Sequence, residues 1–312
     1  MISKEQLEMW ASAPSPTEME KIRNARTVIE NIIKRRLPTE EIKKNYALDN
    51  FEYEIYLQGS YANSTNVRFD SDVDIVVQLN KPFFSDKSQL SELERNIFDS
   101  GHKDTPYEFK NFKEDILSTL SQELPSQQIV NSDKCIKIEE NTNRVKADVV
   151  ACIQYRVYKK YLSFLDEDSF VEGIKFFNTS NNLEIINYPK THINNCESKN
   201  KDTEGKFKDM IRIYKNMRNK LIEEKVFDDK TAPSYFIENL LYNCSSPCFD
   251  GSYNDCMVKI LQFVIDAIES GRITGFVCAN EQDTLISQKT WNLQDLILFI
   301  NKTANYYIGE NV

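Results

Sequence analysis

Residues 57–79 read L-Q-G-S-Y-A-N-S-T-N-V-R-F-D-S-D-V-D-I-V-V-Q-L, a pattern in which two extended segments flank a glycine turn. The first segment, residues 51–57, alternates apolar and polar side chains as a half-buried strand does, and the alternation stops at Gly59-Ser60. The second segment has a β-branched interior, residues 75–77. These features predict a strand, a glycine turn with a short helix, and a second strand.

Two acidic residues, Asp72 and Asp74, open the second predicted strand. Successive side chains of a strand point to opposite faces, so both carboxylates project from one face and Val73 from the other. At a separation of about 4 Å and an effective dielectric constant of about 20, two such charges repel by roughly 4 kcal/mol, and a divalent cation removes this cost. The pair therefore indicates a metal site, although a lone D-x-D in an acidic chain is typical of a solvated turn.

Gly59 and Ser60 supply the complementary half of a nucleotide site. Glycine lets the backbone approach a ligand without a Cβ atom in the way, and the serine hydroxyl and the N–H groups of a following helical turn can bind an anion. A G-S pair alone is typical of a simple turn. Its place directly after a strand, with D-x-D on the next strand, favours a site with phosphate on one side and metal on the other.

The same conjunction resembles the polymerase-β-type nucleotidyltransferase superfamily. The sequence motif G-S-Y-x-N-x-T-N-V-R-x-x-S-D-V-D-I-V is similar to that of the cGAS/DncV-like nucleotidyltransferases, and most similar to that of their clade E. These enzymes make cyclic oligonucleotide signals in bacterial antiphage defence. The similarity runs from residue 57 to about residue 242. It implies an α/β (α+β) fold with a mixed-sheet nucleotidyltransferase lobe, residues 1–195, a C-terminal helical lobe, residues 196–312, and a cleft between them.

Length and charge narrow the class of protein. A chain of 312 residues, with 40% hydrophobic and 28% charged side chains, is long enough for two globular domains. Its formal net charge of −9 disfavours stable binding of nucleic acid, which needs a basic face. The first residues are charged and no apolar run approaches about 18 residues, so we expect a cytoplasmic protein without membrane attachment. We also expect a monomer.

The seven cysteines predict reduced thiols, because their number is odd and they are scattered along the chain. Neither His192-x-x-x-Cys196 nor Cys244-x-x-x-Cys248 has the spacing of a structural zinc site. We therefore interpret these cysteines as thiols and not as metal ligands.

Hydrophobic periodicity predicts the remaining elements. Apolar residues recur at helical spacing from residue 15 to residue 38, a segment that the resemblance makes a spine joining the two lobes. Further helices are expected at residues 87–99, 109–124, 207–221, 234–242, 255–270 and 291–307, and further strands at residues 135–139, 144–154 and 184–188.

Asp148 interrupts the apolar, β-rich run V-K-A-D-V-V-A-C-I. An acid inside a buried strand is unfavourable unless it is paired, protonated or bound to metal, and a hydrogen-bonded buried carboxylate is the alternative. The third metal ligand of the family lies on such a strand. The resemblance therefore implies a catalytic and metal-binding triad of Asp72, Asp74 and Asp148 that holds two Mg²⁺ ions, with Mn²⁺ as a substitute.

The resemblance also assigns nucleotide contacts, which are expected from Gln58, Gly59, Ser60, Asn187, Lys215, Ser234 and Tyr235. Lys215 and Ser234 would meet phosphate, and Tyr235 would stack on the donor base. Asn187 has an amide donor and a carbonyl acceptor, which suit the edge of uracil. From the residues alone, Lys215 is one of many solvated helix lysines, Tyr235 is equally a core residue, and Asn187 equally caps a turn.

These assignments predict a cyclic dinucleotide synthase that joins two nucleoside triphosphates, UTP and ATP, and releases pyrophosphate. Its product would contain a pyrimidine, as cyclic UMP-AMP or cyclic di-UMP, and would activate a downstream effector. Alternatives are a template-free nucleotidyltransferase acting on RNA or a small-molecule acceptor, and a non-catalytic nucleotide-binding module. A sugar transferase that uses D-x-D would leave the G-S turn unexplained.

Overall fold

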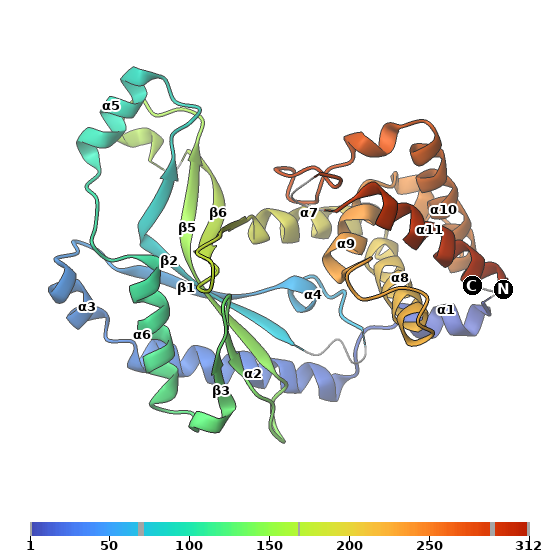
Figure 1. Ribbon diagram of the computed structural model, residues 1–312, viewed down its shortest axis with the longest axis horizontal. Helices are drawn as coiled ribbons and strands as arrows, with labels where there is room; N and C mark the ends of the chain where they lie inside the picture. Colours follow the sequence, from blue (N-terminus) through green and yellow to red (C-terminus); the bar gives the residue numbers. More distant parts are fainter. Residues whose placement is uncertain (1, 68–71, 168, 288–290, 311–312) are drawn as a thin grey trace. The chain divides into compact units, whose positions relative to one another are not determined.

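The computed structural model describes residues 2–67, 72–167, 169–287 and 291–310, which fall into two compact units (Figure 1). We call the described part of residues 16–58 and 71–190 the sheet unit. The described part of residues 1–15, 59–70 and 191–312 is the helical unit. The described parts of residues 1–15 and 59–70 thus pack with the helical unit, although they precede the sheet unit's last strands in the chain. The expected division at residue 195 instead assigned every earlier residue to one lobe. That division stays a prediction.

A mixed sheet of seven strands forms the centre of the sheet unit. Its order is β1-β2-β5-β4-β3, and β6 pairs with both β5 and β7. The β2–β5 pair is parallel and the other pairs are antiparallel. The strands are β1 Glu52–Gln58, β2 Val73–Asp86, β3 Ile129–Asn131, β4 Ile136–Ile138, β5 Ala147–Tyr158, β6 Phe170–Phe177 and β7 Glu184–Asn187. The predicted strand, turn and strand around Gly59 are confirmed.

One face of the two central strands is apolar. Val73, Ile75 and Val77 of β2 are fully buried, and their partners on β5 are apolar as well. Helix α2 (Pro16–Arg36) packs against β2, and α6 (Phe109–Ser121) packs against β5 and α2. Burial of β-branched residues under helices therefore fixes which side of β2 carries its polar side chains.

The predicted long helix before the sheet is α2, which is amphipathic. Its buried residues are Ile22, Ala25, Ile29, Ile32 and Ile33. The helix ends in a basic triplet, where Arg35 and Arg36 bind Glu123 at 2.9 and 2.7 Å. Cations are favoured at a helix C-terminus because the unpaired carbonyl groups there carry partial negative charge. The sheet unit also contains α3 (Thr39–Tyr46) and α5 (Glu92–Gly101).

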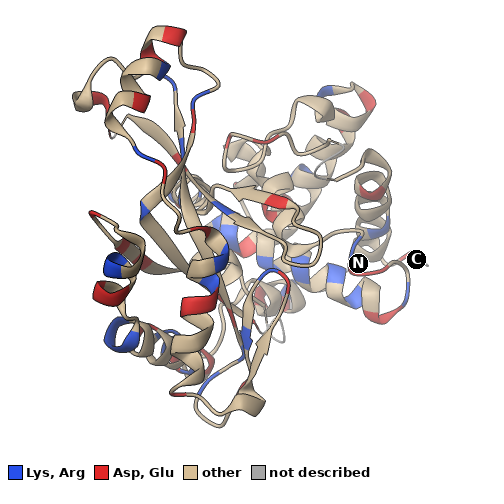
Figure 2. Ribbon diagram, turned by 60° about the vertical axis from the view of Figure 1, so that its left-hand side comes forward, with Lys and Arg blue, Asp and Glu red and all other residues tan. Residues whose placement is uncertain are grey.

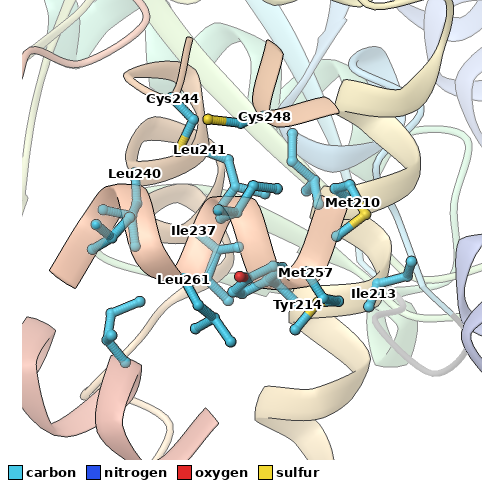
Figure 3. Close-up of a cluster of buried hydrophobic side chains, with 14 of the residues drawn as sticks. Met210, Ile213, Tyr214, Ile237, Leu240, Leu241, Cys244, Cys248, Met257 and Leu261 are labelled. Carbon is cyan, nitrogen blue, oxygen red and sulfur yellow. The ribbon is translucent and has the colours of Figure 1, made fainter. Parts of the chain in front are cut away.

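Helix α8 (Lys206–Glu223) is the centre of the helical unit. It packs against α1 (Lys4–Ala11), α9 (Ser234–Tyr242), α10 (Tyr253–Glu269) and α11 (Leu293–Ile308). Figure 3 shows Met210, Ile213 and Tyr214 of α8 facing side chains of α9 and α10. Because neighbours surround it, eleven of its residues are buried. The predicted helices of this region are confirmed, whereas α7 (Pro189–Asp202) was missed because its polar sequence carries no apolar stripe.

All seven cysteines are described, and each is buried as a free thiol. Their redox state in the cell stays a prediction. Acidic and basic residues are interspersed along the ribbon in Figure 2. Within the ranges given above, no helix is long and apolar enough to cross a membrane.

The hydroxyl group of Tyr214 yields a first prediction. It is buried in the helical core and has no hydrogen-bond partner among the described residues. Because an unsatisfied buried hydroxyl is unfavourable, Tyr214→Phe should leave the free energy of unfolding unchanged or raise it by about 1 kcal/mol. Urea denaturation measures this change.

Tyr307 is the matched control, because its hydroxyl donates to Asn254 Oδ1 at 2.9 Å in the same core. Tyr307→Phe should therefore lower the free energy of unfolding by about 1 kcal/mol. Equal losses from the two phenylalanine variants would contradict the assignment of Tyr214 as unsatisfied.

Candidate functional site

One row of polar side chains crosses three neighbouring strands of the sheet unit. The register pairs Gln58 of β1 with Asp74 of β2, and Asp74 with Asp148 of β5. Lys137 of β4 continues the row beyond Asp148. The family resemblance implies that Asp74 and Asp148 act together, and the parallel pairing of their strands brings them side by side.

Asp148 has an incomplete set of partners. Its Oδ1 atom is buried and has no hydrogen-bond partner within the described ranges. Burial, followed by the charge of Asp148, raises the pKa of the nearby Cys135 thiol to about 11. A buried carboxylate oxygen without a donor is rare in folded proteins, and a bound cation satisfies it. The pair Asp74 and Asp148 therefore fits a divalent metal.

Asp72 precedes the first residue of β2 and is half-buried. Among the described residues, no three His, Cys, Asp or Glu side chains gather closely enough to form a metal cluster. The role of Asp72 as a third ligand stays a prediction.

Gly59 and Ser60 begin α4 (Gly59–Ala62), the residues that directly follow β1 in the chain. Gly59 has φ +68°, a conformation that glycine adopts readily and other residues disfavour. The chain then folds back on this turn, because Asn63 N donates to the Gly59 carbonyl at 3.1 Å and Thr65 N to the Ser60 carbonyl at 2.9 Å. The turn is thus held by the residues that follow it.

A buried carboxylate, Glu238 of α9, gathers four donors within the helical unit. Its Oε1 accepts from Thr65 Oγ1 at 2.5 Å and from Lys215 Nζ at 2.7 Å. Its Oε2 accepts from Asn63 Nδ2 at 2.9 Å and from His192 Nε2 at 3.1 Å. Each oxygen of this carboxylate therefore has two donors.

Charge compensation keeps Glu238 ionised. Burial alone would raise its pKa, but the charge of Lys215 and the hydrogen bonds from His192 and Lys215 outweigh burial and hold the pKa well below its usual range. Lys215 is fully buried, and its ammonium also donates to the Thr65 carbonyl at 3.1 Å. The structure thus gives Lys215 a protein partner that the sequence did not reveal, and its contact with phosphate stays a prediction.

Ser234 and Tyr235 form the first turn of α9. Arg218 Nη2 donates to Ser234 Oγ at 3.3 Å, so a second cation of α8 lies beside the serine. The Tyr235 side chain is exposed, with 42% of its surface accessible, and its ring lies 4.8 Å from the His192 ring and 5.8 Å from the Trp291 ring. Tyr235 is therefore not a core residue.

Asn187 is exposed at the end of β7, paired with Ile174 of β6. A Cβ atom on the adjacent Gly173 would lie 3.0 Å from the Asn187 carbonyl and 2.9 Å from the Tyr188 ring. Glycine at position 173 thus lets this turn lie directly on β6.

Lys190 fixes the segment that follows Asn187. Its ammonium binds Glu54 of β1 and Glu172 of β6, both at 2.6 Å. Burial lowers the pKa of Lys190, but these hydrogen bonds outweigh burial and raise it. The exposed amide of Asn187 is therefore held on a rigid support.

Sequence reasoning missed Glu238, His192 and Arg218. A signal for Glu238 was present, because it is the single charged residue in S-Y-F-I-E-N-L-L, as Asp148 is the single acid in its strand. His192 gave no such signal, since its partner lies 46 residues away.

Comparisons with known proteins agree with this architecture. Residues 39–175 match a nucleotidyltransferase domain, and residues 194–308 match the cGAS/DncV-like nucleotidyltransferase C-terminal helical domain. The chain is 37% identical over 310 residues to the cyclic nucleotide synthase CdnE01 of Staphylococcus haemolyticus, with 98% of each chain covered. It is 35% identical over 270 residues to the cyclic UMP-AMP synthase of Rhodothermus marinus, with 84% of this chain and 89% of that one covered.

Solved structures give the same result. The R. marinus CdnE c-UMP-AMP synthase, solved with Apcpp and Upnpp, matches with a TM-score of 0.83 and 32% identity over 99% of this chain and 97% of that one. The Elizabethkingia meningoseptica CdnE cyclic dinucleotide synthase, solved with GTP and Apcpp, has a TM-score of 0.77 and 27% identity over 99% of this chain and all of that one. The chain belongs to the cGAS/DncV-like nucleotidyltransferases and, within them, to the CdnE cyclic nucleotide synthases.

Proposed function

We propose that this nucleotidyltransferase joins UTP and ATP, or two UTP molecules, into a cyclic dinucleotide and releases pyrophosphate. The relatives differ in product, since the R. marinus enzyme is a cyclic UMP-AMP synthase and the E. meningoseptica enzyme a cyclic dipurine nucleotide synthase. Membership of the family therefore leaves the bases open. The exposed, anchored amide of Asn187 supports a uracil-containing product, cyclic UMP-AMP or cyclic di-UMP.

The pairing of Asp74 with Asp148 carries the proposal, because the Oδ1 atom of Asp148 is buried and receives no hydrogen bond from the part of the chain that the structure describes. Asp72, Asp74 and Asp148 would hold two Mg²⁺ ions, or Mn²⁺ in their place. When bound, such ions neutralise the charge that develops on the leaving pyrophosphate and lower the pKa of the attacking ribose hydroxyl. Carboxylates are the hard oxygen ligands that these ions prefer.

The remaining site residues orient the substrates. Phosphoryl transfer depends on in-line positioning and charge neutralisation more than on covalent chemistry. Gly59, Ser60 and Ser234 would hold triphosphate groups, Gln58 would contact the nucleotide, and Tyr235 would stack on the donor base. Lys215 is fully buried against Glu238, so it could reach phosphate only if this ion pair opened. After the first transfer the linear product turns round, and a second transfer closes the ring.

The proposal extends to the setting of the enzyme. It acts as a cytoplasmic monomer, and its product activates a separate effector in antiphage defence. The interspersed charges and the net charge of −9 support small triphosphates as substrates over a long nucleic acid.

Incubation with Mg²⁺ and the four labelled nucleoside triphosphates, followed by phosphatase, tests the function. We expect a phosphatase-resistant product without any added acceptor, and mass spectrometry identifies its bases. A requirement for RNA or a small-molecule acceptor would indicate the alternative transferase. Triphosphate binding without any product would indicate a non-catalytic module.

Substitution of Asp148 separates metal binding from a structural role. Asp148→Asn removes one of the facing negative charges at nearly constant volume, so the metal-free protein should melt at the same temperature or higher. The variant should lose the stabilisation that Mg²⁺ with a nonhydrolysable triphosphate gives the parent, because this stabilisation follows RT ln(1 + [L]/Kd). Its product formation should fall to background.

Asp104→Asn is the control for Asp148, because Asp104 is an exposed loop carboxylate of the same unit. It should behave as the parent in all three measurements. An Asp148→Asn protein that is less stable by roughly 1 to 3 kcal/mol, yet still responds fully to Mg²⁺ and triphosphate, would show a hydrogen-bonded structural acid instead.

Tyr235→Ala should weaken triphosphate affinity by about 1 to 3 kcal/mol, the contribution of one aromatic stack on a base. Its effect on unfolding should be small because the ring is 42% exposed. Tyr235→Phe should retain affinity. The fully buried neighbour Phe236 is the control, since Phe236→Ala should destabilise by about 3 to 5 kcal/mol. Comparable destabilisation by Tyr235→Ala would rule out stacking as its main role.

Asn187→Ser should lower the ratio of UTP to ATP incorporation, because serine cannot offer a donor and an acceptor together in the geometry of an amide. The control is Asn181→Ser in the preceding turn, where Asn181 Oδ1 accepts from Leu183 N at 3.0 Å. This control should leave the ratio unchanged. If both variants keep the parental ratio, Asn187 does not select the base.

A further inference from the structure

Glu238 connects three segments of the helical unit that are distant in the sequence. Its donors come from residues 63–65, from His192 of α7 and from Lys215 of α8, and Glu238 itself belongs to α9. The carboxylate is 2% exposed, so these bonds are shielded from solvent. Hydrogen bonds to a buried charge are stronger and more directional than those at a surface.

On one side the cluster leads to the glycine turn. Thr65 donates its hydroxyl to Glu238, and its main-chain N–H donates to the Ser60 carbonyl at 2.9 Å. Asn63 does the same, with its amide on Glu238 and its main-chain N–H on the Gly59 carbonyl at 3.1 Å. Two hydrogen bonds in series therefore join the Glu238 carboxylate to each residue of the turn.

On the other side the cluster leads to the first turn of α9. Glu238 lies four residues after Ser234 and three after Tyr235, which places it one helical turn away on the same side. His192, which donates to Glu238, also packs its ring 4.8 Å from the Tyr235 ring. The support of Tyr235 thus depends on the same carboxylate as the glycine turn.

Stability alone does not account for this arrangement. A buried ion pair is commonly no more stable than an apolar replacement of similar volume. Two of the donor residues also retain a buried acceptor that lacks a partner in the described residues, Asn63 Oδ1 and His192 Nδ1. Both oxygens of the Glu238 carboxylate thus have their full set of hydrogen bonds, whereas two of the donor residues do not. This is expected if the cluster serves to hold the carboxylate in a fixed position.

We propose that Glu238 is a positioning residue that locks the Gly59-Ser60 turn to the Ser234-Tyr235 turn, so that both meet one nucleotide in a fixed geometry. This rests on the proposed function in taking these turns as nucleotide contacts. Glu238 itself touches no substrate. Loosening the cluster should therefore weaken triphosphate binding in a protein that is still folded.

Thr65→Val tests the lock, because valine keeps the shape of threonine and removes the hydroxyl that donates to Glu238. At a temperature well below melting, the Kd for a nonhydrolysable triphosphate with Mg²⁺ should rise about tenfold, as expected for one lost hydrogen bond to a charged group. Thr65→Ser keeps the hydroxyl and should restore the Kd to within about twofold of the parent.

His192→Phe is an independent variant, which keeps a ring beside Tyr235 but cannot donate to Glu238. It should also raise the Kd, several-fold, and it remains informative if Thr65→Val does not fold. Both variants are preferred to Glu238→Gln, which would leave the Lys215 charge buried without compensation.

The outcomes are distinct. In one outcome, Thr65→Val and His192→Phe both fold with a lower melting temperature and yet keep the parental Kd. This result would overturn the positioning role and show that Glu238 is a structural residue. Parent protein that binds the triphosphate but makes no cyclic product would contradict the proposed function. The ratio of variant to parent Kd would still show whether Glu238 positions the two turns. Parent protein that binds no triphosphate would overturn both.

Discussion

The parallel pairing of β2 with β5 is the constraint on which the site depends. It sets Asp74 beside Asp148, and it sets Val73 and Ile75 beside apolar partners on the opposite face. A slip of one residue in either strand would turn a carboxylate into the apolar layer and an apolar side chain onto the polar face. Burial of the β-branched residues therefore holds the two acids together despite their mutual repulsion.

Two acids of this chain, the buried Glu238 and the half-buried Asp148, have carboxylate oxygens inside the protein and differ in their partners. Glu238 has four donors, two on each oxygen, and stays ionised within a complete set of partners. Asp148 keeps a buried oxygen to which none of the described residues donates. Because the protein supplies every partner of Glu238, that carboxylate holds its neighbours in place, whereas the buried oxygen of Asp148 is suited to binding a cation.

Sequence reasoning succeeded where the signal is local. The strand, turn and strand around Gly59, the helix α2 and the helices after residue 206 follow from alternation, periodicity and turn residues. It failed for α7, which has a polar sequence, and for the cluster around Glu238, where Thr65 lies 173 residues from its partner. Periodicity shows that a residue is buried but not which distant residue it meets. The nucleotide contacts came from resemblance, and the structure adds the supports that hold them.

The central claim is that Asp74 and Asp148 bind a divalent metal. The most direct test is to measure the Mn²⁺ affinity by electron paramagnetic resonance in the presence of a nonhydrolysable triphosphate. If the β2–β5 register builds a metal site, Asp74→Asn and Asp148→Asn should each weaken Mn²⁺ binding by at least about tenfold, the least expected when a ligand is lost. The exposed control Asp104→Asn should bind Mn²⁺ as the parent does. Parental Mn²⁺ affinity in both site variants would contradict the account.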